Sequence, residues 1–210
     1  MAFTGAHIIP IAGEPIANGV LVVHRGKILA VGPTGAVTIP AGADLREARG
    51  KVIMPGLVDS HSHIGGGQGA DGSAPIQPDV RVLDAIDVRH PSIQKAQAGG
   101  ITTANVMPGS GHLISGQTLY LKLRDGRVID DLLITLPDGR TAGGLKMANG
   151  TNSIRTPGGP FPGTRAKSAA LVREQFIKAQ EYQARLERTK GDPEKIPARD
   201  LALEMLVEVL

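Results

Sequence analysis

Two histidines separated by a single residue carry the strongest chemical signal in this 210-residue sequence. His61 and His63 follow the largely apolar stretch 52–58, which is typical of a β-strand. Residues two apart on a strand point to the same side, so both imidazoles could face one ion. Neutral imidazole is a common ligand of zinc and similar divalent ions. The pattern alone also allows two strand histidines that merely share a surface.

Composition excludes several classes of protein. Aromatic residues make up only 2% of the chain, and the net charge of +3 is scattered, so neither base stacking nor a clustered basic footprint for nucleic acid is expected. The absence of cysteine excludes disulfides, thiolate zinc sites and a cysteine nucleophile. No apolar run reaches membrane-spanning length, and no leader pattern is visible. We therefore expect a cytoplasmic protein without a membrane or nucleic-acid partner.

The first fifty residues have the pattern of a small β-domain, with a hairpin at 20–31 that turns through Arg25-Gly26-Lys27. Beyond residue 52, apolar strand-like runs alternate with helical spacing, which favours a parallel α/β sheet. The expected strands are 52–58, 101–107 and 119–123, and the expected helical segments are 80–98 with a break at Pro91, 164–189, and one that starts at residue 200.

Three motifs resemble those of a known enzyme family. Residues 55–63, Pro-Gly-Leu-Val-Asp-Ser-His-Ser-His, resemble the first-strand signature of the amidohydrolase superfamily of metal-dependent hydrolases. Residues 107–117 and 144–152 are similar to two blocks of its imidazolonepropionase-related members, with Thr151 where glutamate is usual. The resemblance implies part of a β-sandwich in residues 1–51. It also implies the N-terminal half of a (β/α)8 TIM barrel, about four β/α units, in residues 52–210.

In this resemblance His61 and His63 become ligands of a divalent metal, expected to be zinc, with one or two ions bound. Lys146 falls at a plausible fourth strand, where some members carry a carboxylated lysine that bridges two metals. It is therefore predicted to be both a metal ligand and a catalytic group. A lysine that pairs with a substrate carboxylate, or that packs near the barrel mouth, is the alternative.

Four further residues complete the predicted site. His112, in a Gly/Ser-rich loop after the second strand, is predicted to be catalytic, with a plain loop histidine as the alternative. Asp59 falls on the same strand face as the two histidines and is predicted to orient one of them. Arg155 and Arg165 flank the loop 156–163 and are predicted to bind a substrate carboxylate, with a solvated surface charge as the alternative for each. His90, beside Pro91, is expected to be structural.

A complete (β/α)8 barrel takes about 250 residues, so residues 52–210 accommodate only about half of one. The ligands that the family takes from later strands, two histidines and an aspartate, find no counterpart in this sequence. We therefore expect a complementary C-terminal half-barrel polypeptide, in a hetero-oligomer, to complete the site. The alternative is a longer protein that was cleaved, split or only partly represented by this sequence. Half a barrel alone would leave strand edges open to association.

The implied reaction is hydrolysis of a carbon–nitrogen bond in an amide, cyclic amide or dipeptide by metal-activated water. An aspartate from the complementary half would carry the proton. Two other classes remain open. One is ester or phosphotriester hydrolysis on the same fold, because a fold does not fix a substrate. The other is a non-catalytic fragment or subunit that retains the motif.

Overall fold

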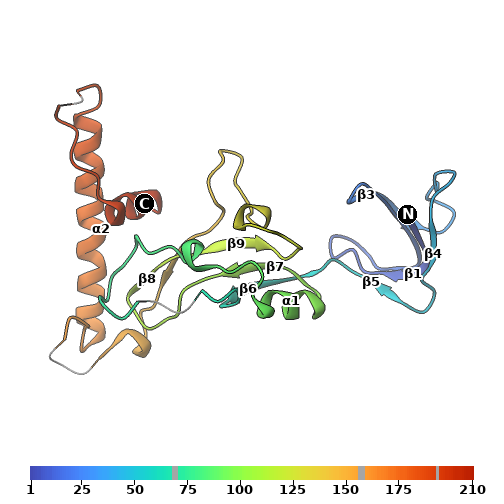
Figure 1. The fold of residues 1–210 in the computed structure, drawn as a ribbon, viewed down its shortest axis with the longest axis horizontal. Helices are drawn as coiled ribbons and strands as arrows, with labels where there is room; N and C mark the ends of the chain where they lie inside the picture. The colour runs from blue at the N-terminus through green and yellow to red at the C-terminus, as the bar shows by residue number, and fades with distance from the viewer. Residues whose placement is uncertain (68–70, 156–158, 193) are drawn as a thin grey trace. The chain divides into compact units, whose positions relative to one another are not determined.

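The computed structural model describes residues 1–67, 71–155, 159–192 and 194–210. It divides into two compact units, Met1–Gly56 and Leu57–Leu210, which together give a mixed α/β architecture (Figure 1). Across the described ranges, every helix is too short or too polar to cross a lipid bilayer. The strands are β1 Ala2–Ile8, β2 Ile16–His24, β3 Lys27–Pro33, β4 Leu45–Glu47, β5 Val52–Ile53, β6 Leu57–Ser62, β7 Ile101–Val106, β8 Ile114–Gln117, β9 Leu119–Lys122 and β10 Leu145–Met147. The α-helices are α1 Pro91–Ala98, α2 Arg165–Arg188 and α3 Leu201–Glu208, and the 3-10 helices are η1 Val82–Ala85, η2 Ile129–Asp131 and η3 Thr151–Ser153.

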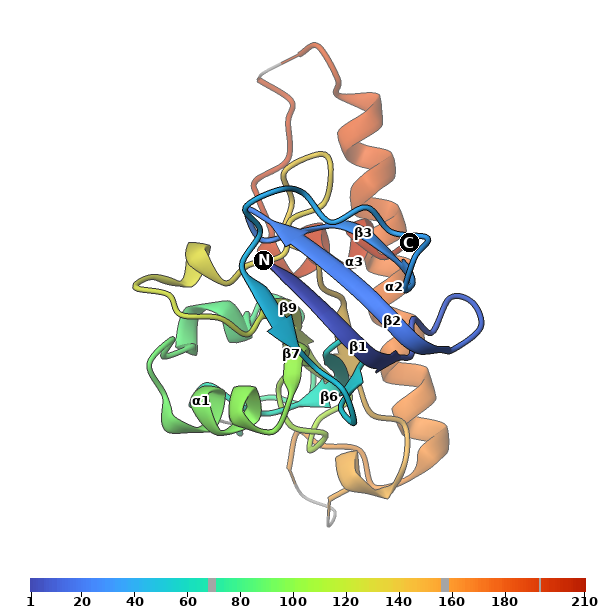
Figure 2. The same ribbon diagram turned by 90° about the vertical axis from the view of Figure 1, so that its right-hand side faces the viewer.

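The N-terminal unit is a five-stranded sheet in the order β3-β2-β1-β4, with β5 also paired to β1. The strands β1, β2 and β3 are antiparallel, and Figure 2 shows β1 and β2 side by side. Small and β-branched side chains such as Ala2, Val20 and Val22 form its buried layer, as half-buried strands require. The hairpin expected at 20–31 is confirmed as β2–β3. Its turn residues Arg25 and Gly26 both have positive φ, at 47° and 75°, as a type I′ turn demands.

The prediction of one continuous strand at 52–58 is wrong. Val52–Ile53 forms β5 and pairs with His7–Ile8 in the N-terminal sheet, whereas β6 begins only at Leu57 in the second unit. Pro55 explains the break because it has no N–H to donate to a sheet. The segment 54–56, which ends the first unit, therefore connects β5 to β6.

The second unit begins with a β-α-β arrangement. The strands β6 and β7 are parallel, and α1 lies between them in sequence and packs on β7 (Figure 1). Pro91 is the first residue of α1, where a missing N–H costs nothing, and Gly99-Gly100 ends the helix as predicted. Apolar residues of β7, α1 and β9, among them Ile93 and Leu121, form a common core.

The third strand was predicted to run parallel to the second, and this direction is wrong. The strand β9 runs antiparallel to β7, with Ala104 opposite Leu121. A parallel neighbour needs a long crossover that usually contains a helix. Residues 107–118 contain the short strand β8 instead, and the chain returns alongside β7.

The expected fourth parallel strand is also absent from the described pairings. Lys146 lies on β10, which pairs antiparallel with β8 so that Lys146 faces Gly116. The Lys146 side chain nevertheless reaches His61 on β6. Among its named strands, the described part of the second unit thus contains the parallel pair β6–β7 and the antiparallel pairs β7–β9 and β8–β10.

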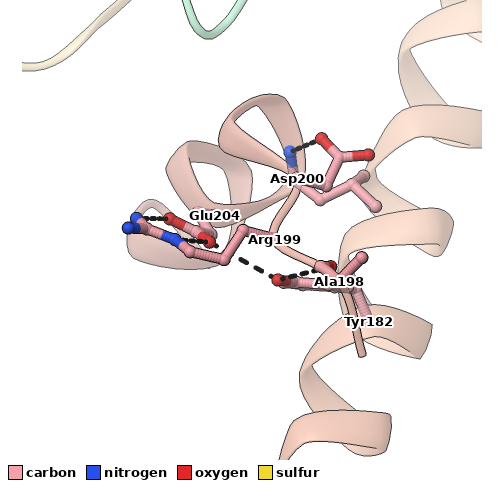
Figure 3. Close-up of polar contacts among 6 residues, drawn as sticks. Tyr182, Ala198, Arg199, Asp200 and Glu204 are labelled. Atoms are coloured by element: carbon pink, nitrogen blue, oxygen red, sulfur yellow. Dashed lines mark hydrogen bonds and ion pairs between the residues drawn. The ribbon is translucent and has the colours of Figure 1, made fainter. Parts of the chain in front are cut away.

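Two helices end the chain, and both were predicted closely. Thr164 caps α2 by accepting from the Lys167 N–H at 3.2 Å, and Asp200 caps α3 by accepting from the Leu203 N–H at 3.0 Å. Figure 3 shows how the two helices meet: the Tyr182 hydroxyl lies 3.5 Å from the Ala198 carbonyl oxygen and 3.5 Å from Glu204 Oε1.

Candidate functional site

The two histidines lie at the carboxyl end of β6. Between Asp59 and Ser62 the register against β7 shifts, so β6 carries a bulge that reaches the first histidine of the motif. Ser62 is buried, whereas His61 and His63 are exposed on the opposite side. Their ring centres lie 5.2 Å apart with an interplanar angle of 76°. The alternation around Ser62 thus presents both imidazoles together, as expected.

A backbone carbonyl fixes the tautomer of His63. The Nδ1 atom of His63 lies 2.7 Å from the carbonyl oxygen of Met107, which directly follows β7. A carbonyl oxygen can only accept a hydrogen bond, so Nδ1 carries the proton and Nε2 keeps its lone pair. Metal-bound histidines commonly donate their other ring nitrogen to a carbonyl in this way.

Lys146 joins this pair from β10. Its Nζ atom lies 3.3 Å from His61 Nε2 and 3.3 Å from the sulfur of Met107. Residues 61, 107 and 146 are far apart in sequence, yet the strand ends bring them into direct contact. The three predicted metal-site residues His61, His63 and Lys146 therefore form one cluster, which we call the histidine–lysine cluster.

The two imidazoles fit a shared ion. Zinc–nitrogen bonds are about 2.0–2.1 Å, so the ring centres of two imidazoles on a tetrahedral ion lie about 5 Å apart. The 5.2 Å separation of the His61 and His63 rings matches this spacing. Among the residues that the structure describes, no three histidine, cysteine, aspartate or glutamate side chains gather as a ready-made site. The described chain thus offers two imidazole ligands, with Lys146 beside them.

Asp59 makes a different contact from the one expected. Its Oδ1 accepts from the backbone N–H of His61 at 3.1 Å. The bulge after Asp59 breaks the strict alternation on which its orienting role was inferred. In the structure Asp59 supports the backbone of the motif, and its described contact is with neither imidazole ring.

His112 belongs to a separate cluster with Phe161 and Arg155. The His112 ring is buried, with its centre 5.2 Å from that of Phe161. The Arg155 guanidinium lies 4.8 Å from the same aromatic ring and donates to the Gly111 carbonyl oxygen at 2.7 Å. Arg155 therefore ties together the loops around His112.

None of the described contacts links His112, Arg155 or Arg165 to the histidine–lysine cluster. Arg165 is exposed in the first turn of α2. The loop proposed between the two arginines includes residues 156–158, which lie outside the described residues. The substrate-binding roles of Arg155 and Arg165 remain predictions.

Burial lowers the pKa of His112 below its usual value, and the positive charge of Arg155 lowers it further. The unfolded chain therefore binds a proton at this histidine more readily than the folded protein does. The stability contributed by neutral His112 is complete above about pH 6.5 and is lost as the pH falls below that value.

We expect His112→Phe, which keeps a ring against Phe161, to weaken the fall in unfolding free energy between about pH 6.5 and 5. Urea titrations at several pH values measure this slope, and an unchanged slope would contradict the assignment.

Sequence reasoning missed Asn105 on β7. Its Oδ1 is buried without a partner among the described residues, and the residue lines a cavity of about 380 Å³ together with Met107 and Lys146. Asn105 precedes Met107 by two residues, and residues two apart in an extended segment point to the same side, which could have indicated Asn105. A buried unpaired amide oxygen is costly, so a ligand that donates a hydrogen bond there would be favoured.

Comparison with known proteins is consistent with this geometry. No protein-family model matches the sequence. Over 179 residues the chain is 32% identical to the amidohydrolase tasK of Hapsidospora irregularis, which covers 77% of this chain and 18% of that protein. Over 161 residues it is 29% identical to an imidazolonepropionase of Rhizobium rhizogenes, which covers 61% of this chain and 40% of that protein.

A solved structure extends the likeness to the fold. The crystal structure of an amidohydrolase from Thermotoga maritima MSB8 matches with a TM-score of 0.83 and 28% sequence identity over 99% of this chain. The match covers 55% of that protein. The chain thus spans about half the length of the Thermotoga protein and a smaller share of the two curated relatives.

Proposed function

This chain belongs to the amidohydrolase superfamily, and from that membership we propose that it forms part of a metal-dependent hydrolase of carbon–nitrogen bonds. The observation that carries the proposal is the histidine–lysine cluster. Its three side chains converge from β6 and β10, and His63 is held in the tautomer that a metal ligand needs. The substrate is a small molecule with an amide or cyclic amide, or a dipeptide.

His61 and His63 would hold a divalent ion through their Nε2 atoms, and zinc, which neutral imidazole binds readily, is the expected cation. A bound ion supplies Lewis-acid activation of water and polarises the scissile carbonyl. The protein contributes the position of the two rings: the Met107 carbonyl oxygen orients His63, and the Asp59 carboxylate supports the backbone of His61. One ion or two could be bound, according to the state of Lys146.

The contact between Lys146 and His61 argues for a modified lysine in the metal-bound protein. As an ammonium, Lys146 donates to His61 Nε2 at 3.3 Å and uses the lone pair that a metal requires. We propose that the neutral amine instead attacks carbon dioxide, which forms a carbamate and releases a proton. The carbamate replaces a cation with an anionic oxygen ligand that positive metal ions stabilise.

We propose that a complementary C-terminal half-barrel, outside these 210 residues, supplies the remaining ligands and completes a (β/α)8 barrel. Catalytic zinc takes three protein ligands, and the described residues provide two imidazoles.

The surface of β6 also supports the proposal of a complementary half-barrel. This strand is at the edge of its sheet, and its Leu57 and Val58 side chains are 51% and 63% exposed. Adjacent exposed apolar residues on an edge strand are typical of a surface that pairs with another chain segment.

Variants of Lys146 test the proposal in the complete, metal-loaded enzyme. We expect Lys146→Ala to lower kcat/KM for a hydrolysed dipeptide or N-acyl amide by about 10²-fold, because an oxygen ligand is lost. Added propionate, which brings a carboxylate to the vacated space, should restore part of this activity. Lys146→Arg keeps the positive charge but cannot form the carbamate, so it should be as inactive as the alanine variant.

The exposed Lys122 at the end of β9 provides the control, because Lys122→Ala removes a lysine away from the cluster. Activity retained by Lys146→Arg, with no rescue of the alanine variant, would support a lysine that pairs with a substrate carboxylate and would contradict the carbamate. Failure of the complete enzyme to cleave any carbon–nitrogen bond would overturn the proposed function.

A further inference from the structure

A second imidazole faces the cavity beside His63. This cavity, of about 300 Å³, is lined by His63 together with His90 and Ser92. His90 precedes α1, so the loop that follows β6 carries it to the end of the strand that bears the metal motif. In parallel α/β folds, this end of the sheet is where ligands bind.

Hydrogen bonds fix the protonation of the His90 ring. Its Nδ1 accepts from the backbone N–H of Ser92 at 3.3 Å, which caps α1, and lies 2.7 Å from Ser92 Oγ. That oxygen already accepts from the Gly65 N–H at 2.9 Å, so its own proton is free to be donated to Nδ1. Because Nδ1 is an acceptor, the neutral ring carries its proton on Nε2.

The glycines after the metal motif allow the ring to approach closely. Gly66 has a φ of 75°, and a β-carbon there would lie only 3.2 Å from His90 Cδ2. The imidazole therefore packs on bare backbone. No described residue accepts a hydrogen bond from Nε2 of His90. This atom is also not among the buried side-chain atoms that lack a partner in the described chain, which lie on Asn105, His112 and Ser115. Among the described residues, the Nε2–H of His90 thus has no hydrogen-bond partner, and the ring lines the cavity.

The chemistry of the lining favours a neutral partner. No arginine or lysine occurs among the described residues that line this cavity, and glycines and Ile64 make up much of the remainder. In the metal-free protein, a carboxylate moving from water into this cavity would meet no cationic side chain among the described lining residues, and its desolvation would be costly. A carbonyl oxygen needs only one neutral donor.

We propose that His90 is a substrate-binding residue: its Nε2–H, fixed by Ser92 and Gly65 beside His63, donates to a neutral carbonyl oxygen of the substrate. This assignment rests on the proposed function, which it narrows to substrates with an uncharged acyl or cyclic amide group at this position. A free carboxylate of a dipeptide would have to bind elsewhere in the site.

Two substitutions separate the donor from the helix cap. Asparagine is a favoured N-cap residue, so His90→Asn keeps the cap on α1 but is too short to reach the cavity. His90→Gln loses much of the cap but returns an N–H donor near the position of Nε2. In the complete, metal-loaded enzyme we expect His90→Asn to raise KM about tenfold with kcat nearly unchanged, as for the loss of one hydrogen bond made equally in the bound and transition states. His90→Gln should stay within about threefold of the wild-type KM.

Equal KM values in all three proteins would overturn the proposal. An equal rise in both variants would also overturn it, because that result follows the loss of the ring and not of the donor. Thermal melting of each variant reports the cap separately, and there we expect His90→Gln to be the less stable of the two.

A binding measurement separates this inference from the proposed function. In the complete assembly without metal, nitrogen-15 spectra of labelled histidine should show His90 protonated on Nε2. Pyrrolidone, a neutral cyclic amide, should shift this signal, whereas acetate should not. A response to acetate alone would overturn the neutral-acceptor assignment. A response to pyrrolidone in a protein that cleaves no carbon–nitrogen bond would leave the His90 donor standing and refute the hydrolase, while hydrolysis with an unresponsive His90 would refute the donor alone.

Discussion

Replacing His63 with alanine should lower kcat/KM of the complete enzyme by at least about 10³-fold, because a metal ligand worth several kcal/mol in the transition state is removed. His63 is exposed, and its one described hydrogen bond is to the Met107 carbonyl oxygen, so removal of the ring costs one described polar contact. We therefore expect the fold to survive. Elemental analysis should show at least one metal equivalent lost per chain, in parallel with the activity.

The exposed His24 at the end of β2 is the matched control. His24→Ala should leave both metal content and kcat/KM unchanged, because this histidine lies in the N-terminal unit and belongs to no ligand cluster among the described residues. Full metal content in the His63 variant would refute the metal site. Lost metal with intact hydrolysis would refute a catalytic role for the ion while leaving the site itself in place.

Local signals in the sequence predicted several element boundaries well. The α2 helix begins after Thr164 and α3 begins after Asp200, and both side chains make the capping hydrogen bond that their residue types favour. The β2–β3 turn follows from Arg25-Gly26, where glycine accepts positive φ. Each of these features depends on a few neighbouring residues, and a single sequence contains that information.

Strand partners could not be predicted in the same way, because pairing depends on residues far along the chain. Val52–Ile53 has the same apolar character as β6, and only its pairing with β1 assigns it to the N-terminal sheet. The residues of β9 would suit a parallel or an antiparallel strand equally, and the return of the chain through β8 decides its direction. Hydrophobic pattern determines which face is buried but not which strand lies alongside.

The same distinction between local and long-range information applies to the candidate site. The spacing of His61 and His63 is local and was read directly, and the position of Lys146 followed from a motif. The donor at His90 was missed because it depends on three separate segments: the glycine turn after β6, the start of α1 and the cavity beside His63. Sequence alone assigned His90 only a structural role, and its contact with Ser92 does cap the helix as that role implies.

Substituting Gly116 with alanine is expected to destabilise the second unit by about 3 kcal/mol, through backbone strain combined with overpacking. Gly116 is buried in β8 with a φ of 121°, and a β-carbon there would lie 2.4 Å from the carbonyl oxygen of Val80. That oxygen accepts the N–H of Gln117 at 2.7 Å, so the obstacle is hydrogen-bonded backbone that cannot simply move aside. Gly116 also faces Lys146 across the β8–β10 pair. The substitution should therefore displace Lys146 and lower metal content as well as the urea midpoint.

Two other glycines separate the causes of this loss. Gly139 has a φ of 87°, and a β-carbon there would meet nothing within 4 Å, so Gly139→Ala should cost only the left-handed strain of about 1 kcal/mol. Gly150 has an ordinary φ of −97° and equally open surroundings, so Gly150→Ala should change stability by less than about 0.5 kcal/mol. A Gly116→Ala loss no larger than that of Gly139→Ala would mean that the Val80 backbone yields to the new methyl group. Full stability loss with unchanged metal content would show instead that the β8–β10 register is not what positions Lys146 against His61.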